Sequence, residues 1–293
     1  MKMTFGLELE LPDIDTRIEI PQHLGIYDLE DFTIVNNNGI ANDPKKRYVL
    51  IGSEVNMTPT ETVDQLVGNV EELYSLVDTK TNHKSNLHVH IAVPGLKEDY
   101  TSLTKLIDYT FKYGEYVMSQ VDIMPDPTTE ELAHRIKHLK KSHQYEYPKS
   151  YQGRILAGKT VSEVRDAHQP MSGERRLTHL VKRAGINVRS LWDNGTIEFR
   201  HWFGTDDIAQ YRDAIEWCKL YVENAIGKQE HPDKLLNSKK WNFPTMAPWN
   251  LELQKGWEYT NLEKNKRTVV KERLQKLLDD GKIERQNLGS MFR

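Results

Sequence analysis

Hydrophobic and polar residues alternate along four segments of the chain, a pattern typical of β-strands that bury only one face. In residues 86–93 the odd-numbered positions are apolar, whereas His88 and His90 occupy even-numbered positions. Three other segments bring charged or amide side chains to one face in the same way: Glu8 and Glu10 in 3–11, Glu54 and Asn56 in 48–57, and Glu198 and Arg200 in 195–203. We therefore predict a sheet with one apolar face and one polar face, and a site on the polar face.

The segment 195–203 also yields a prediction for its bulky side chains. Strict alternation places Trp202 on the polar face together with Glu198 and Arg200. The same alternation assigns four residues to the apolar face: Ile197, Phe199, His201 and Phe203.

Segments with a helical period separate the strands. A helix is predicted to begin after Thr58, because Thr58, Pro59 and Glu61 match an N-cap, a first helical position and a capping box. Further helices are predicted near 98–120, 128–142 and 206–226, and further strands near 32–35 and 186–191. Strands and helices do not alternate strictly, so the predicted class is α+β: a mixed or antiparallel sheet with helices on its apolar face and a polar, metal-binding concave face.

Composition and charge narrow the class of protein. The chain has 293 residues and a formal net charge of −3, without the basic bias of a dedicated nucleic-acid binder. Its single cysteine, Cys218, excludes an intrachain disulfide, and its helical spacing with apolar residues indicates a core position. No apolar stretch approaches the roughly 20 residues of a membrane span, and no signal peptide is recognisable. We expect a cytoplasmic protein without membrane contact.

The character of the sequence changes near residue 229. We predict a catalytic domain over 1–228 and a C-terminal extension over 229–293, which contains Trp241, Trp249 and Trp257 and then a charged amphipathic helix over 261–282. The simpler interpretation is that this extension wraps the domain with its tryptophans as anchors. The alternative is a specificity element or a dimer contact.

The predicted polar face has the ligands of a divalent cation site. Glu8, Glu10, Glu54 and Glu198 contribute four carboxylates, and His88 adds an imidazole. Such an oxygen-rich set suits Mg²⁺ or Mn²⁺ with bound phosphates better than a structural zinc ion. Four carboxylates exceed the needs of one ion, so we expect two or three ions. The alternative is an ordinary sheet whose polar face is solvated.

Two basic residues near these strands have the chemistry of phosphate or carboxylate clamps. Arg200 follows Glu198 by two positions, so it is placed to contact a phosphoryl group held by metal ions. Arg183 belongs to a basic group that leads to the segment around Asn187. For both arginines the alternative is a side chain that is simply solvated at the protein surface.

Four short motifs, in this order along the chain, resemble those of the amidoligase family. They are FGLELE at 5–10, GSEVNMTP at 52–59, LHVH at 87–90, and Asn187 followed by GTIEFR at 195–200. The family comprises carboxylate–amine ligases with the glutamine synthetase and glutamate–cysteine ligase fold. The resemblance covers about residues 3–227 and implies a glutamine synthetase-like sheet and an enzyme that uses ATP and Mg²⁺, or Mn²⁺, to form an amide bond through an acyl phosphate.

The resemblance also implies roles for individual residues. It assigns the metal ions to Glu8, Glu10, Glu54, His88 and Glu198. His90 would contact the nucleotide phosphates, and Arg200 would steady the transferring phosphoryl group. Beside the resemblance, we predict that Asn187 and Arg183 join His90 and Arg200 as cofactor contacts. Glu54 is our candidate for the base that deprotonates the amine, so the predicted catalytic residues are Arg200, Glu54 and Glu198. The expected partners are a small-molecule or peptide carboxylate and an amine.

A competing motif lies at residues 153–160, where GRILAGKT satisfies the P-loop pattern. A P-loop needs a buried strand before it and a long helix after it, so that backbone N–H groups surround the phosphate. The preceding residues YEYPKSY do not predict a buried strand, and Pro170 limits the helix that follows. We therefore interpret this part of the polar stretch 143–180 as a flexible, basic lid.

Two other functions remain open from the sequence alone. The same carboxylates suit a metal-dependent hydrolase or nuclease. The second alternative is a non-catalytic binding protein that retains the fold, with nucleic acid as the partner of the basic segment 134–189.

Overall fold

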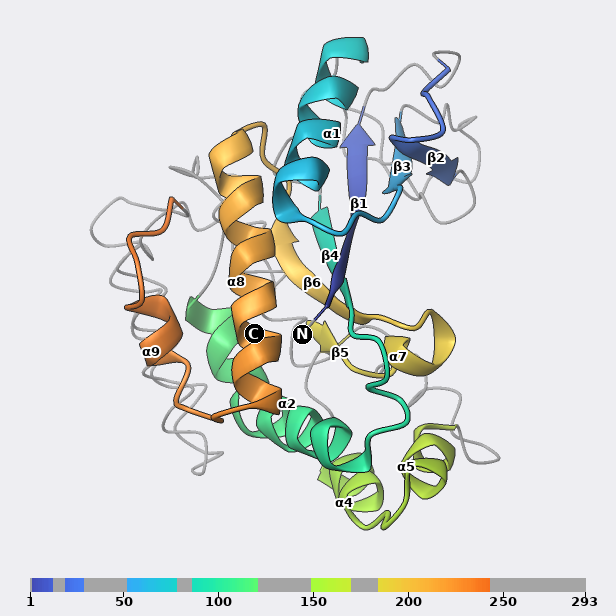
Figure 1. The fold of residues 1–293 in the computed structure, drawn as a ribbon, viewed down its shortest axis with the longest axis vertical. Helices are drawn as coiled ribbons and strands as arrows, with labels where there is room; N and C mark the ends of the chain where they lie inside the picture. The colour runs from blue at the N-terminus through green and yellow to red at the C-terminus, as the bar shows by residue number, and fades with distance from the viewer. Residues whose placement is uncertain are drawn as a thin grey trace, which may run out of the picture.

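The computed structural model describes residues 2–12, 19–28, 52–77, 86–120, 149–169 and 184–242. Within these ranges six strands form one sheet in the order β2-β3-β1-β4-β6-β5, and every neighbouring pair is antiparallel (Figure 1). The strands are β1 (Thr4–Pro12), β2 (Gly25–Asp28), β3 (Gly52–Met57), β4 (Asn86–Ala92), β5 (Ile186–Asn187) and β6 (Ile197–Phe203). The predicted α+β class and antiparallel sheet are confirmed. The predicted strand at 32–35 and the helices at 128–142 and 261–282 lie outside the described residues.

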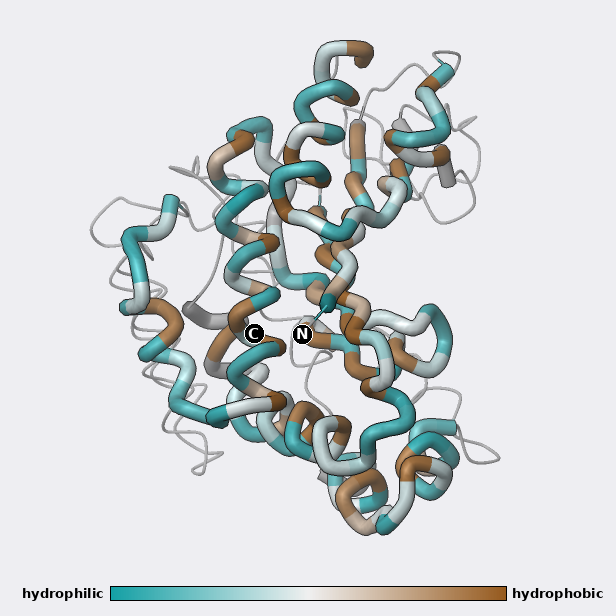
Figure 2. Tube along the Cα trace, in the orientation of Figure 1, coloured by the Kyte–Doolittle hydropathy of each residue, from teal (hydrophilic) through white to brown (hydrophobic). Residues whose placement is uncertain are grey.

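One face of the sheet, here called the core face, is covered by helices. Helices α1 (Val63–Leu76) and α8 (Ile208–Ile226) run side by side across the strands, and α2 (Tyr100–Gln120) packs against α8 (Figure 1). Bands of hydrophobic residues recur along α1 and α8 (Figure 2). The alternating apolar residues of β1, β4 and β6 are buried against these helices: Phe5, Leu7, Leu9, Leu11, Leu87, Val89, Ile91, Ile197 and Phe199. The predicted hydrophobic alternation thus determines which face the helices cover.

The first helix begins later than predicted. Thr62, not Thr58, is the N-cap of α1, and its hydroxyl accepts a hydrogen bond from the backbone N–H of Gln65. The chain remains extended up to Thr60 because Phe5 and Thr60 exchange two backbone hydrogen bonds of 2.9 Å. Both threonines are good cap residues. The pairing of Thr60 with Phe5 of β1, which is distant in sequence, therefore determines that the helix begins after Thr62.

The alternation in β6 is interrupted, and the prediction for Trp202 is wrong. Leu87 pairs with Trp202 and Val89 pairs with Phe199, so one residue of β4 faces two residues of β6 between these pairs. This extra residue is a β-bulge, and it reverses the inside–outside pattern beyond it. Trp202 is therefore fully buried, and its indole N–H contacts Cys218 Sγ at 3.2 Å. Cys218 is a core residue as predicted, and burial raises the pKa of its thiol.

Two predictions for the segment 143–191 need correction. Only Ile186 and Asn187 of the strand predicted at 186–191 are extended, and the short helix α7 (Ser190–Asp193) follows. The described part of the predicted lid forms two helices, α4 (Lys149–Leu156) and α5 (Val161–His168). Apolar side chains of α4 and α5 are buried, and α4 packs against α2, so residues 149–169 are not a weakly structured segment.

Residues 228–242, here called the C-terminal strap, lie along α8 and include the short helix α9 (Asp233–Leu236). The side chain of Asn224 on α8 exchanges hydrogen bonds with the backbone of Glu230. At the far end of the strap, buried Asp213 accepts a hydrogen bond of 2.8 Å from Lys239 Nζ and another from the backbone N–H of Asn242. The described beginning of the predicted extension thus packs on the domain. Among the helices of the described ranges, none has the length and apolar character to cross a bilayer.

The strap gives a prediction for stability. Asp213→Asn should lower the free energy of unfolding by about 2 kcal/mol, because hydrogen bonds to a charged group contribute about 1.5–3 kcal/mol. Glu216→Gln is the matched control, since Glu216 contacts the same Lys239 Nζ but is partly exposed, and such pairs contribute about 0–1 kcal/mol. Urea denaturation of both variants measures the difference. Equal losses in the two variants would contradict the anchoring role of Asp213.

Candidate functional site

The register of the sheet assembles the polar side chains that were predicted to form a site. Directly opposed residues of antiparallel strands share a face. Glu8 lies between Asn56 on β3 and His88 on β4. The next row joins His90 on β4, Glu198 on β6 and Asn187 on β5, and a third pairs Glu10 with Glu54. We call this side of the sheet, opposite the helices, the polar face.

Glu8 is the centre of the polar face. Its Oε2 lies 2.6 Å from Nδ1 of His88, and its Oε1 lies 2.9 Å from Nε2 of His90. Burial raises the pKa of the Glu8 carboxyl, but the two imidazoles outweigh this effect and hold the pKa well below its ordinary value. Glu8 is therefore an ionised carboxylate, which is the form that binds a cation.

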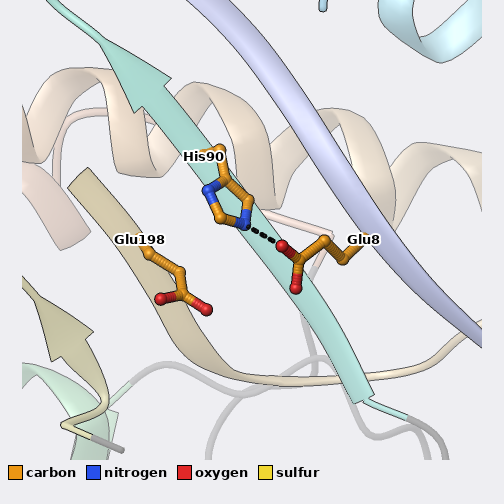
Figure 3. Close-up of side chains that lie close together, drawn as sticks. All are labelled: Glu8, His90 and Glu198. Carbon is orange, nitrogen blue, oxygen red and sulfur yellow. Dashed lines mark ion pairs between the residues drawn. The ribbon is translucent and has the colours of Figure 1, made fainter. Parts of the chain in front are cut away.

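Glu198 is buried within a set of hydrogen-bond donors. Its Oε2 accepts a hydrogen bond of 2.7 Å from Asn187 Nδ2, and its Oε1 accepts one from the guanidinium of Arg200. The same Oε1 lies 3.8 Å from Nδ1 of His88. Figure 3 shows Glu8, His90 and Glu198 on three neighbouring strands, with their side chains on one side of the sheet and a helix passing behind it.

Two overlapping groups of side chains have the geometry of metal ligands. One comprises Glu8, His90 and Glu198, and the other comprises Glu8, Glu54 and His88; within each group the ligand atoms lie within 4.8 Å of one another. Glu10 belongs to neither group. Its Oε2 accepts two hydrogen bonds from Asn86, of 2.9 and 2.8 Å. Glu10 thus shares the polar face without joining the described ligand groups.

The state of His90 indicates that the first group fits a cation. Nε2 of His90 is buried and forms an ion pair of 2.9 Å with Oε1 of Glu8, without a regular hydrogen bond. Buried polar atoms without a regular hydrogen bond are rare. A cation held by the carboxylates of Glu8 and Glu198 would give this nitrogen a ligand bond in addition to its contact with Glu8. Carboxylate oxygens with some imidazole are a donor set that suits Mg²⁺ or Mn²⁺.

Most of the residues predicted for the site lie together. Glu8, Glu54, His88, His90 and Glu198 form the two groups, and Arg200 and Asn187 contact Glu198 directly. Arg183 lies outside the described residues. Sequence analysis did not predict a role for Thr196 and Ser190, although both join the network around His90. The only signal for Thr196 was its even-numbered place in the strand pattern.

The P-loop pattern at 153–160 does not have a P-loop structure. Gly153 lies inside α4, so a helix precedes the loop where a P-loop has a strand. The backbone N–H of Lys159 donates to the Glu163 carboxylate at 2.6 Å, and Thr160 is the N-cap of α5. A carboxylate of the protein itself therefore occupies a position that a P-loop reserves for phosphate.

This geometry gives a prediction for nucleotide binding. Lys159→Ala should keep most of the affinity for ATP, because Lys159 lies in a helix–helix connection. His90→Ala and Arg200→Ala should lose far more activity, because these two side chains are on the polar face. Binding of a fluorescent ATP analogue and turnover measure the two effects. The reverse ranking would restore the P-loop interpretation.

A separate hollow of about 480 Å³ lies between the start of β1, α1 and α8. It is lined by Lys2, Met3, Phe5, Glu61, Thr62, Val63, Asp64, Glu216, Lys219 and Leu220. Its lining includes both acidic and basic groups, and one pair, Lys2 and Glu61, is joined at 2.6 Å. Neither candidate ligand group borders this hollow. The chemistry of the described residues therefore points to the polar face.

Comparisons with known proteins do not assign the chain to a family. No protein-family model and no curated protein matches it. The chain is similar to the crystal structure of a bifunctional glutathione synthetase from Pasteurella multocida, with a TM-score of 0.39 and 14% identity over 98% of this chain and 50% of the other. The chain thus spans about half the length of that synthetase. A similarity of this size does not identify a shared fold or activity, and the amidoligase resemblance stays a prediction.

Proposed function

We propose that the chain is an ATP- and Mg²⁺-dependent carboxylate–amine ligase that forms an amide bond through an acyl phosphate. The observation that carries the proposal is the pair of ligand groups that share Glu8. Two adjacent cation sites with an arginine beside them suit the binding of a triphosphate better than the binding of a single structural ion. The order of the four amidoligase-like motifs, which all converge on this face, supports the same activity.

The chemistry requires activation of the carboxylate. A carboxylate is a poor electrophile because its leaving group would be oxide. In the proposed first step, a carboxylate oxygen attacks the γ-phosphorus of ATP, the bond to the β–γ bridging oxygen breaks, and ADP leaves. In the second step, the amine attacks the acyl carbon, inorganic phosphate leaves with the former carboxylate oxygen, and the amine loses a proton. Bound Mg²⁺ would neutralise the triphosphate and polarise its oxygens.

The residues of the polar face have chemical properties that match these steps. Glu8, Glu54, His88 and Glu198 would hold the ions, with His90 directed at the same place or at the phosphates. The guanidinium of Arg200 is partly exposed beside Glu198, so it can reach charge on the transferring phosphoryl group. Glu54 is buried next to Glu10 in the register and is the candidate base for the amine proton.

Hydroxylamine can test the proposal before the natural amine is known. Purified protein with ATP and Mg²⁺ is incubated with hydroxylamine and a panel of amino acids and dicarboxylic acids, and hydroxamate and phosphate are measured. We expect hydroxamate and phosphate in equal amounts for at least one acid, and neither product without ATP. The control is Glu72→Gln, which lies outside the polar face and pairs with His23. Hydrolysis of esters or DNA without ATP would instead establish the hydrolase, and a DNA shift without any ATP consumption would establish a binding protein.

A further inference from the structure

We infer that Thr196, Ser190 and Asn187 are positioning residues that form one hydrogen-bonded chain of residues between His90 and Glu198, in which Ser190 bonds Asn187 through its backbone and Thr196 through its side chain. The inference rests on the cation site of the proposed function, but not on the ligase reaction. It gives a role to two residues, Thr196 and Ser190, that the sequence did not single out. It also changes the role of Asn187 from a contact with the cofactor to a support for Glu198.

The chain begins at Asn187, which is buried with both ends of its amide in use. Its Nδ2 donates to Oε2 of Glu198 at 2.7 Å, and its Oδ1 accepts from the backbone N–H of Ser190 at 3.3 Å. A carboxylate can only accept and a backbone N–H can only donate, so these partners fix the amide in one orientation. Asn187 therefore holds Glu198 through the protein itself.

The chain continues through two hydroxyl groups. Oγ of Ser190 lies 3.2 Å from Oγ1 of Thr196, and Asn194 Nδ2 donates to the same serine oxygen at 3.3 Å. Oγ1 of Thr196 lies 3.0 Å from Nδ1 of His90. The segment between α7 and β6 thus links two candidate ligands that occupy neighbouring strands.

A tight turn places Thr196 at this position. The backbone N–H of Asn194 donates to Ser190 O at 2.7 Å, and that of Thr196 donates to the same oxygen at 3.4 Å. Gly195 closes the turn with a φ of +78°, which a residue with a side chain rarely adopts. The turn therefore sets the hydroxyl of Thr196 against the imidazole of His90.

The contact with Thr196 determines how the imidazole presents its second nitrogen. Because Nδ1 is held by Thr196, the ring directs Nε2 toward Glu8. A cation ligand must offer the lone pair of Nε2, so the proton must then reside on Nδ1. Oγ1 of Thr196 can accept that proton's hydrogen bond and turn its own hydrogen to Ser190. A methyl group in place of the hydroxyl would leave Nδ1–H buried without an acceptor.

The test compares Thr196→Val, which is close in shape but lacks the hydroxyl, with Thr196→Ser, which keeps it. Mn²⁺ binding is measured by electron paramagnetic resonance on the full chain without nucleotide. We expect Thr196→Val to weaken Mn²⁺ binding by about 10–100-fold, the usual cost of losing a partner of a ligand histidine. Thr196→Ser should remain near the unsubstituted protein. Circular dichroism and thermal unfolding check that both variants fold.

A second measurement separates this inference from the proposed function. In ¹⁵N NMR spectra at fixed pH, the His90 ring should change its tautomer or ring-nitrogen shifts in Thr196→Val and not in Thr196→Ser. If the unsubstituted protein binds no Mn²⁺, the cation site fails, and the NMR comparison alone decides whether Thr196 positions His90. Unchanged Mn²⁺ affinity and unchanged His90 signals in Thr196→Val would overturn the inference.

A double-mutant cycle tests whether the network acts as one unit. Asn187→Ala and Thr196→Val lie at the two ends of the chain, next to Glu198 and His90 respectively. Residues that act through one network show effects on affinity that do not add. We expect the double variant to bind Mn²⁺ more tightly than the product of the two single losses predicts. If the two losses of Mn²⁺ affinity add, Asn187 and Thr196 position their ligands independently, and the inference of one network is overturned.

Discussion

Glu198→Gln is expected to abolish ATP-dependent turnover while the protein remains folded. Glu198 is buried between Asn187 and Arg200, and it belongs to the ligand group that includes Glu8 and His90. Glutamine keeps the volume and one acceptor for Asn187 but loses the negative charge that a cation requires. Polarisation by a metal ion stabilises the transition state by several kcal/mol, and about 1.4 kcal/mol corresponds to a tenfold change in rate. We therefore expect turnover to fall by about 1000-fold or more.

The measurement for Glu198→Gln combines turnover, Mn²⁺ affinity and thermal unfolding. Glutamine is a better test than alanine, because alanine would leave Asn187 Nδ2 without its acceptor inside the protein. Glu72→Gln is the control for an equal change of charge away from the polar face. Turnover within about tenfold of the unsubstituted protein would remove Glu198 from the reaction.

Glu8→Gln is expected to have the larger effect on metal binding. Glu8 is shared by both ligand groups, whereas Glu198 belongs to one. Its two oxygens also lie next to both imidazoles, so the substitution changes the charge beside His88 and His90 together. We therefore expect Glu8→Gln to weaken every Mn²⁺ site of the polar face and Glu198→Gln to weaken one of them.

Titration of Mn²⁺ followed by electron paramagnetic resonance gives the number and affinity of the sites in each variant. The expected order is the unsubstituted protein with two or more sites, then Glu198→Gln, then Glu8→Gln with the fewest. Thermal unfolding identifies any loss caused by misfolding. An equal number of Mn²⁺ ions bound by the two variants would contradict the inference that Glu8 is shared by both cation sites.

The sheet and its polar face could be predicted because burial acts on every second residue of a strand. In β1 and β4 the apolar residues face α1 and α8, and the same register carries Glu8, His88 and His90 to the other side. For this reason the sequence was sufficient to place these side chains on one face, without knowledge of the strand order.

Features that depend on distant contacts could not be predicted. The bulge in β6 adds one residue opposite β4, and nothing in the local alternation of 195–203 indicates that Trp202 turns into the core. The start of α1 depends on a backbone pairing between Phe5 and Thr60. The role of Thr196 depends on a histidine that lies far away in the sequence. In each case the structure depends on a contact with a residue that is distant in sequence, which a local pattern of residues cannot show.

The fate of the carboxylate oxygen tests the proposed acyl phosphate most directly. The acid that yields hydroxamate is prepared with ¹⁸O in its carboxylate, and the products of one reaction with ATP are examined by mass spectrometry. Transfer of the carboxylate oxygen to phosphorus predicts one ¹⁸O atom in each molecule of inorganic phosphate released, with ADP unlabelled. Label in AMP would show activation by adenylation, and amide or acid products formed without consumption of ATP would contradict the ligase altogether.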